Sequence, residues 1–211
     1  MNKLIFMNDV STDIDKRSLL VGSRDVSATE EGLQQSVDIA KYFISRAPKI
    51  NVILTSDASR ISRLVHCIRF FSEDNYLTRV HVKVLDSLRE RSFGVLTGTP
   101  HSLDSEIFTH SRICPEEGES VGQCRDRAVY PLKVILDKNP GSTLLVVSHP
   151  FVCQIVTNFF LGKAVTFLTD FWFKKGSVVM LVRKDKPGWS LEEAYNSIEE
   201  RDYKLEEICG N

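Results

Sequence analysis

Two short apolar runs constrain the fold of this chain more than any other feature. Residues 3–7 (KLIFM) and 143–148 (TLLVVS) show no alternation of polar and apolar side chains. Runs of this kind and length are typical of parallel strands buried on both faces, and they are too short for buried helices. Each run ends in polar residues, Asn8-Asp9 after the first and Ser148-His149 at the end of the second. Ligands of an open α/β sheet bind just beyond the carboxyl ends of its strands, so these polar residues mark a candidate site.

Alternating strand and helix patterns fill the rest of the chain. Thr29 is a suitable N-cap for a helix that Pro48 ends, and the alternating side chains of 80–84 are typical of a strand near a sheet edge. The other predicted elements are strands at 51–55 and 177–182, the latter predicted to be the last, and helices at 29–46, after residue 60, at 120–138 and at 150–162. Residues 186–188 are predicted to turn the chain back, and the acidic tail after Leu191 is predicted to be peripheral, with helical character. We therefore predict an α/β three-layer sandwich, in which helices flank a mostly parallel central sheet.

The composition is that of an ordinary globular domain, which we predict to cover residues 1–211. Hydrophobic residues make up 42% of the chain, charged residues 26%, and the net charge is −1, so nothing indicates nucleic acid or a membrane surface as a partner. The five cysteines are scattered, which favours buried, reduced thiols over disulfides or a zinc site. The N-terminus carries no basic segment followed by a long apolar stretch, which predicts a cytoplasmic protein. The long excursion at 85–119 is predicted to be a functional or mobile loop.

Polar groups from three predicted strand-to-helix turns converge at one edge of the sheet. The turns carry Asn8-Asp9, then Asp57 with Arg60, and then Ser148-His149, and the segment 88–94, which contains Glu90, could reach over them. An arginine and a histidine at helix N-termini, beside free backbone N–H groups, form a natural anion site. Each residue taken alone has an ordinary structural explanation as a cap, a turn former or a surface residue. Their joint placement at one sheet edge favours a function.

At this point the chain resembles the histidine phosphatase superfamily, the phosphoglycerate-mutase-like proteins, over nearly its whole length. Where the family's first strand ends in Arg-His-Gly-Glu-Thr, this chain has Asn-Asp-Val-Ser-Thr at residues 8–12. The other family segments match in order at 22–32 (GSRDVSATEEG), 56–60 (SDASR), 88–94 (LRERSFG), 115–120 (PEEGES), 146–150 (VVSHP) and 187–189 (PGW). The resemblance implies the three-layer phosphoglycerate-mutase-like fold.

The resemblance also implies roles for individual positions. In the family the first histidine accepts the phosphoryl group, two arginines and a second histidine hold the phosphate, and an acid protonates the leaving group. Carried over, Arg60 and His149 are the phosphate-binding residues that are kept, and Glu90 is the candidate acid. Asp9 stands at the nucleophile position and Asn8 at that of the first phosphate-binding arginine. The departures gather in the pocket, where Val10 and Pro150 also replace glycines of the family motifs.

These two substitutions change the charge of the pocket. Asn8 removes a bidentate cation, and Asp9 places an anion where a group that can be cationic is expected. A carboxylate about 4 Å from a phosphate charge costs roughly 4 kcal/mol per unit pair at an effective dielectric constant near 20. Phosphate affinity is therefore expected to collapse, and Asp9 is expected to pair with Arg60 or a protonated His149 in the space that phosphate occupies in the family.

The sequence therefore predicts a catalytically impaired member of this fold, a binding or regulatory subunit whose partner is an active paralogue or a second copy of itself. The first alternative is a phosphomonoesterase with altered chemistry that uses Asp9, Arg60, Glu90 and His149, with Asp9 itself phosphorylated. The second is a sensor in which Arg60 and His149 bind a singly charged anion or small phosphorylated ligand. A further alternative is a divalent cation held by Asp9, Asp57, Glu90 and His149. The spacing of these residues gives it no support, so no metal and no cofactor are predicted.

Overall fold

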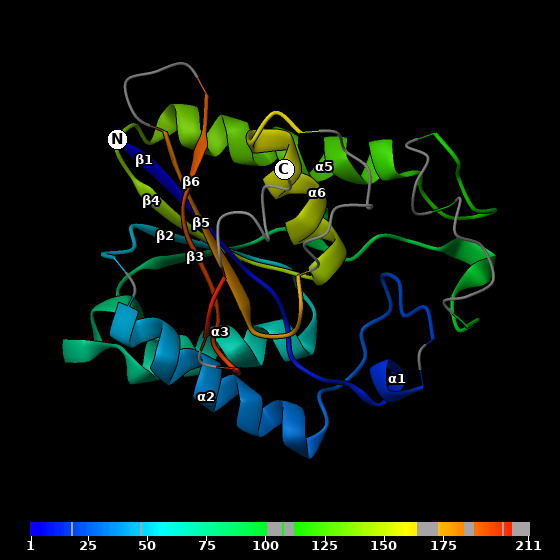
Figure 1. Ribbon diagram of the computed structural model, residues 1–211, viewed down its shortest axis with the longest axis horizontal. Coiled ribbons are helices and arrows are strands. Elements are labelled where there is room, and N and C mark those ends of the chain that lie inside the picture. The colour runs from blue at the N-terminus through cyan, green and yellow to red at the C-terminus, as the bar shows by residue number, and fades with distance from the viewer. Residues whose placement is uncertain are drawn as a thin grey trace.

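In the computed structural model, one mixed sheet forms the centre of the molecule (Figure 1). The structure describes residues 1–17, 19–46, 48–100, 107, 112–163, 173–183, 188–199 and 201–203. Within them the seven strands run in the order β3-β2-β4-β1-β5-β6-β7. Their bounds are β1 Asn2–Met7, β2 Val52–Thr55, β3 His81–Val84, β4 Thr143–Val147, β5 Ser177–Arg183, β6 Ser190–Asn196 and β7 Arg201–Asp202. Strands β3, β2, β4 and β1 pair in parallel, whereas the β1–β5, β5–β6 and β6–β7 pairs are antiparallel.

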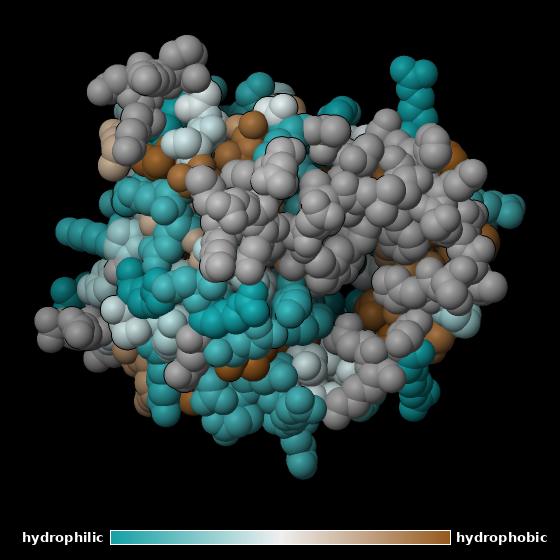
Figure 2. Space-filling model, in the orientation of Figure 1, coloured by the Kyte–Doolittle hydropathy of each residue, from teal (hydrophilic) through white to brown (hydrophobic). Residues whose placement is uncertain are grey.

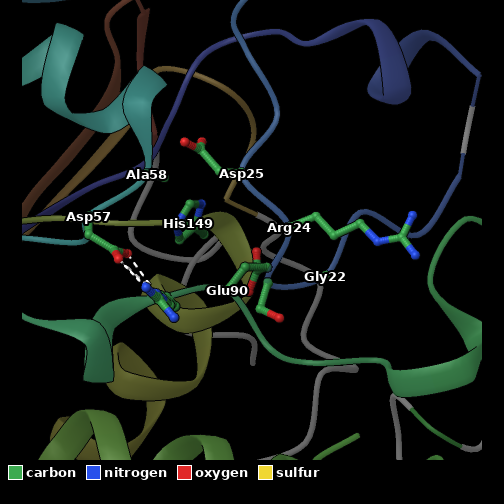
Figure 3. Close-up of a pocket in the computed structure, with 9 residues that line it drawn as sticks. Gly22, Arg24, Asp25, Asp57, Ala58, Glu90 and His149 are labelled. Atoms are coloured by element: carbon green, nitrogen blue, oxygen red, sulfur yellow. Dashed lines mark hydrogen bonds and ion pairs between the residues drawn. The ribbon is translucent and has the colours of Figure 1, made fainter. Parts of the chain in front are cut away.

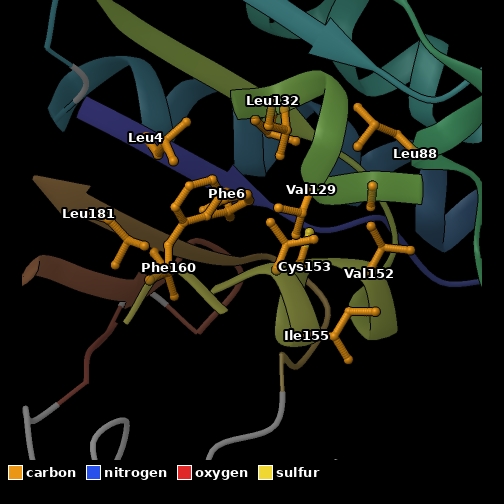
Figure 4. Packing of buried hydrophobic residues seen from close by; sticks show 14 of the residues in the cluster. Leu4, Phe6, Leu88, Val129, Leu132, Val152, Cys153, Ile155, Phe160 and Leu181 are labelled. Atoms are coloured by element: carbon orange, nitrogen blue, oxygen red, sulfur yellow. The ribbon is translucent and has the colours of Figure 1, made fainter. Parts of the chain in front are cut away.

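Helices cover both faces of this sheet, as predicted for a three-layer sandwich (Figure 1). Their bounds are α1 Asp13–Lys16, α2 Glu30–Arg46, α3 Ser59–Phe71, α5 Val121–Lys138 and α6 Pro150–Phe160. Leu4 and Phe6 of β1 pack with α5 and α6 on one face (Figure 4), and Ile5 and Met7 pack with α2 and α3 on the other. Both faces of β1 are therefore buried, which is why its sequence shows no alternation.

Local sequence signals mark where α5 and α6 begin. The side chain of Ser120 accepts a hydrogen bond from the Gln123 backbone N–H at 3.1 Å, and the Gln123 side chain accepts one from the Ser120 N–H at 2.7 Å. This reciprocal capping box begins α5 where the sequence predicts it. The predicted edge strand is also confirmed, because β3 is the first strand of the sheet order. Pro150 occupies the first turn of α6, where its missing N–H costs no hydrogen bond.

The prediction for the C-terminal part is wrong. Residues 177–182 do not form the last strand, because β6 follows β5 as an antiparallel neighbour and β7 follows β6. The tail after Leu191 is neither helical nor peripheral in its first part, since Ala194, Tyr195 and Asn196 are buried. Acidic residues at the exposed end of β6 hide its strand character in the sequence. The predicted turn at 186–188 lies outside the described residues except for Gly188.

The excursion at 85–119 is anchored by a buried arginine over the part that the structure describes. Arg91 is fully buried and donates hydrogen bonds to the backbone oxygens of Glu119 at 2.9 Å, Ile107 at 2.6 Å and Ile113 at 3.4 Å. Arg127 of α5 adds bonds to the oxygens of Ser87 at 2.6 Å and Glu90 at 3.1 Å. The described part is thus fixed to the body of the molecule; residues 101–106 and 108–111 lie outside the described residues.

On the face in Figure 2 the described residues are mostly hydrophilic, with smaller groups of hydrophobic residues among them. Cys67, Cys124 and Cys153 are buried, as predicted, whereas Cys114 is exposed. Among the described helices, none combines the length and the apolar character that a membrane span requires.

Candidate functional site

Of the polar residues predicted to converge, Asp9, Arg60 and His149 are in contact, because three neighbouring strands end side by side. Thr55 of β2 and Met7 of β1 both pair with Val147 of β4. The last residues of these three strands therefore lie side by side, and the segments that follow them enter the site together. These segments are Ser56 after β2, Ser148-His149 after β4 and Asn8-Asp9 after β1. Backbone hydrogen bonds continue the strand pairing one residue further. The Ser148 N–H donates to the Met7 oxygen at 3.0 Å, and the Ser56 N–H donates to the Val147 oxygen at 3.3 Å.

Asp9 is the centre of a buried ion cluster. Its side chain is 1% exposed, and the Arg60 side chain, which is 4% exposed, donates from Nε to Asp9 Oδ2 at 2.7 Å. His149 Nδ1 lies 3.1 Å from the same oxygen. Lys175 Nζ donates to the other oxygen, Oδ1, at 2.5 Å. The structure thus contains the pairing of Asp9 with Arg60 that the sequence predicts, with both carboxylate oxygens bound.

Lys175 is a site residue that sequence reasoning missed. It lies in the turn just before β5, and β5 runs antiparallel to β1 with Val178 opposite Met7. The start of β5 is therefore at the same sheet edge as the end of β1, which the prediction of a mostly parallel sheet gave no reason to expect. The only signal in the sequence is the pair Lys174-Lys175 directly before an apolar strand.

Asn8 does not point its donors into an anion site. Its Nδ2 donates to the backbone oxygens of Phe173 at 2.8 Å and Lys174 at 2.5 Å, and the residue is fully buried. These bonds attach the turn that carries Lys175 to the end of β1. The position that belongs to a phosphate-binding arginine in the family thus fixes a backbone turn in this chain.

Both imidazole nitrogens of His149 are engaged inside the protein. Nε2 lies 3.0 Å from Ser56 Oγ, and Nδ1 lies 2.9 Å from Arg60 Nη2 as well as 3.1 Å from Asp9 Oδ2. Nδ1 can donate to Asp9 or accept from Arg60, but not both with one proton arrangement. In either arrangement both ring nitrogens have partners within the protein.

The pKa of Asp9 is set by two opposing effects. Burial acts to raise it, but the charges of Lys175 and Arg60 and the hydrogen bond with His149 outweigh burial and hold the Asp9 pKa well below its usual value of 3.8. Asp9 is therefore an anion at every physiological pH. A carboxylate with so low a pKa, and with both oxygens already bound, is a weak nucleophile.

This shift predicts how stability depends on pH. The Asp9 pKa is lower in the folded than in the unfolded state, so its contribution is present above about pH 4 and is lost as the pH falls below that value. We expect Asp9→Asn to be less stable than the wild type at pH 7 and the difference to narrow between pH 4 and pH 2.5. Urea unfolding of both proteins across this range measures it, since the other carboxyl groups contribute equally to both. A difference that stays constant with pH would contradict this assignment.

A pocket of about 340 Å³ opens next to His149, one member of the ion cluster (Figure 3). Its lining residues come from the segment after α1, the β2–α3 turn, the excursion and the β4–α6 turn: Gly22, Ser23, Arg24, Asp25, Asp57, Ala58, Arg89, Glu90 and His149. Arg89 pairs with Asp57 and lowers the pKa of that carboxyl group. Of the ion cluster, His149 alone belongs to this lining; Asp9, Arg60 and Lys175 do not.

Glu90 lies in the wall of this pocket together with His149 of the ion cluster. Its two oxygens accept hydrogen bonds from the backbone N–H groups of Arg91 at 2.9 Å and Phe151 at 3.3 Å. Burial raises the pKa of Glu90, and the nearby charge of Asp9 acts in the same direction. A carboxyl group with a raised pKa is suited to donate a proton, so Glu90 places an acid at the pocket. The described residues contain no group of three or more His, Cys, Asp or Glu side chains arranged to hold a metal ion.

Comparison with known proteins places this geometry in a family. A family model of the histidine phosphatase superfamily (branch 1) matches residues 11–197, beginning just after Asn8 and Asp9. The 2,3-bisphosphoglycerate-dependent phosphoglycerate mutase of Streptococcus mutans is 28% identical over 113 residues, 54% of this chain and 48% of the mutase. Phosphoglycerate mutase-like protein 4 of Arabidopsis thaliana is 26% identical over 157 residues, 70% of this chain and 66% of the plant protein. The matched part of this chain thus spans about half the length of the streptococcal mutase.

Solved structures agree with this assignment at the level of the fold. A mycobacterial hydrolase superposes with a TM-score of 0.77 at 21% identity, covering 91% of this chain and 97% of the hydrolase. A mycobacterial glucosyl-3-phosphoglycerate phosphatase in complex with VO3 gives 0.76 at 20% identity, covering 91% and 98%. The chain belongs to the histidine phosphatase superfamily.

Proposed function

We propose that this chain does not transfer phosphoryl groups and serves as a binding or regulatory protein of the superfamily. The observation that carries the proposal is the position of the Asp9 carboxylate, bound by Arg60, His149 and Lys175. Two of these three, Arg60 and His149, are the positions that hold phosphate in the family. An anion that belongs to the protein therefore takes the contacts that a phosphate would need.

Charge repulsion supports the proposal. A phosphate group placed about 4 Å from the Asp9 carboxylate would be disfavoured by roughly 4 kcal/mol per unit charge at an effective dielectric constant near 20. Because 1.4 kcal/mol corresponds to a factor of ten, this repulsion lowers phosphate affinity by about a thousandfold. Phosphoryl transfer consists largely of positioning and of neutralising oxygen charge, so the same repulsion opposes the reaction.

A regulatory role is supported by what the chain retains. The sheet, the capped helices and a pocket of about 340 Å³ are present, while the nucleophile of the family is absent. A fold that retains the pocket but not the nucleophile of the family suits a subunit that binds a small molecule and contacts a partner protein. The partner is an active paralogue or a second copy of this chain.

One observation favours the alternative of an altered phosphomonoesterase. Glu90 lines the pocket with a raised pKa, as a proton donor to a leaving group requires. In that alternative an Asp9 oxygen attacks phosphorus, the bond from phosphorus to the ester oxygen breaks, and the leaving alkoxide takes the Glu90 proton. Asp9 lies outside the pocket lining, and each of its carboxylate oxygens is bound by a cation. This alternative is therefore weaker than the proposed binding or regulatory function.

An activity assay distinguishes the two. We expect the purified chain to hydrolyse p-nitrophenyl phosphate and phosphoglycerate no faster than the buffer does, with or without Mg²⁺, and to carry no trapped phosphate. Asp9→Ala is the control, because a contaminating phosphatase would be unaffected by it. Turnover that Asp9→Ala abolishes, or a hydroxylamine-labile phosphate on Asp9, would overturn the proposal in favour of the alternative.

A further inference from the structure

The Asp9 carboxylate is held the way a bound oxyanion is held. Lys175 Nζ contacts Oδ1 at 2.5 Å, while Arg60 Nε contacts Oδ2 at 2.7 Å and His149 Nδ1 lies 3.1 Å from Oδ2. The three partners come from three different parts of the chain, the turn before β5, helix α3 and the start of α6. Each oxygen therefore has its own cation, which is the arrangement of a site that binds two oxygens of one anion.

Lys175 is fixed in this position by its backbone. Asn8 Nδ2 donates to the oxygens of Phe173 and Lys174, on the N-terminal side of Lys175. Asn196 Nδ2 of β6 donates to the Lys175 oxygen itself at 2.9 Å. Two buried asparagine side chains thus hold the turn, and the Lys175 side chain, 25% exposed, reaches inward to Asp9.

Asp9 is the buried anion that two cations share. Arg60 binds one of its oxygens and Lys175 the other. Arg60 Nη1 also lies 3.9 Å from Asp25 Oδ1, but the Asp25 side chain is 53% exposed, so water screens that charge. Removing the Asp9 carboxylate would take away the anion that lies between Arg60 and Lys175, and the protein supplies that anion itself.

We infer that Arg60, Lys175 and His149 form an oxyanion-binding site in which the Asp9 carboxylate is the resident anion, with Lys175, positioned by Asn8, as its second cation. This deepens the proposed function, on which it rests, because it explains how a site that lost an arginine keeps its cation count. The ligand class is a carboxylate or a tetrahedral oxyanion with two oxygens to offer. In the wild type, the tethered carboxylate excludes free anions from the site.

Chemical rescue tests the inference directly. Asp9→Ala is expected to lower the thermal midpoint, and acetate or inorganic phosphate is expected to restore it by roughly 5–10 °C at about a hundredfold excess over Kd. Wild-type protein in the same salts, at ionic strength matched with sodium chloride, is expected to shift little. A chloride-matched Asp9→Ala midpoint that neither acetate nor phosphate raises would overturn the inference.

Two neighbouring lysines provide a matched control. In the Asp9→Ala background, Lys175→Met is expected to abolish the rescue by acetate. Lys174→Met should leave it intact, because Lys174 is 56% exposed on its side chain and pairs with Glu199 instead. Rescue that survives Lys175→Met would exclude Lys175 from the site.

A second measurement applies if Asp9→Ala does not fold. Asp9→Asn keeps the side-chain volume, and a double-mutant cycle with Lys175→Met then reports their coupling. Lys175→Met is expected to lower the midpoint of the wild type by several degrees and that of Asp9→Asn much less; equal losses would overturn the inference. Phosphatase turnover by the wild type would instead contradict the proposed function and leave both rescue and coupling unaffected.

Discussion

Replacing Asn8 by arginine and Asp9 by histidine is expected to give this chain measurable phosphomonoesterase activity. The double substitution restores a nucleophile at the end of β1 and removes the carboxylate that binds Arg60 and Lys175. Arg60 and His149 then no longer contact a carboxylate at residue 9 and can contact a phosphate, and Glu90 remains in the pocket wall with its raised pKa. Because a single charge-stabilising contact contributes about 10²–10³ to kcat, we expect hydrolysis of p-nitrophenyl phosphate at least about 100-fold faster than in a matched wild-type sample, whose rate should equal that of the buffer.

Single variants separate the two contributions. Asn8→Arg alone retains the Asp9 carboxylate and should remain inactive, whereas Asp9→His alone should show weak activity supported by Arg60 and Lys175. Asn8 is fully buried, so the larger arginine must displace the turn at 173–176, and circular dichroism should establish that each variant is folded. The activity should be accompanied by a phosphohistidine that is absent from Asn8→Arg. A folded double variant without either signal would contradict the expectation that residues 8 and 9 alone separate this chain from an active phosphatase.

The sequence predicted the parallel part of the sheet and its polar turns for a clear physical reason. Strands buried on both faces, such as β1 and β4, must be apolar throughout, and the chain leaves each of them through a polar turn at one edge. Adjacent parallel strands end at that same edge, so the sequence predicts that residues far apart along the chain lie close together there. Asp9, Arg60 and His149 are in contact because of this register.

The antiparallel part could not be predicted in the same way. Strand direction is not encoded in a short apolar run, so nothing indicated that β5 returns beside β1 and delivers Lys175 to the site. The sequence did not predict strand β6, because its exposed half carries Glu192 and Glu193. Glu193 pairs with Arg46 of α2. That ion pair explains acidic residues in a strand, but it depends on a contact 147 residues away in sequence. Contacts between distant segments, and not local sequence preferences, therefore determine both the direction of β5 and the formation of β6.

Removing Arg60 should destabilise the fold more than any other single change in the cluster. Arg60 is 4% exposed and Asp9 is 1% exposed, so Arg60→Met leaves a buried carboxylate with a lysine and a histidine as its remaining partners. Breaking a buried pair on one side costs about 3–5 kcal/mol, which corresponds to a fall of roughly 10 °C in the thermal midpoint of a chain of this size. Arg63→Met, on the exposed side of the same helix, is the matched control and should change the midpoint little.

The double variant Asp9→Asn with Arg60→Met shows whether the stability lost in Arg60→Met comes from the buried Asp9 carboxylate that is left without its arginine. With the carboxylate neutralised, loss of Arg60 no longer leaves an anion with too few partners, so the second substitution should recover part of the stability lost in Arg60→Met. Urea unfolding of the wild type, both single variants and the double variant gives the coupling free energy directly. Additive losses would mean that Arg60 stabilises the fold through its bond to the Val26 oxygen, at 3.3 Å, and its packing rather than through Asp9. Because Lys175 remains beside Asp9 in Arg60→Met, a loss well below 3 kcal/mol would assign the larger share of the charge compensation to that lysine.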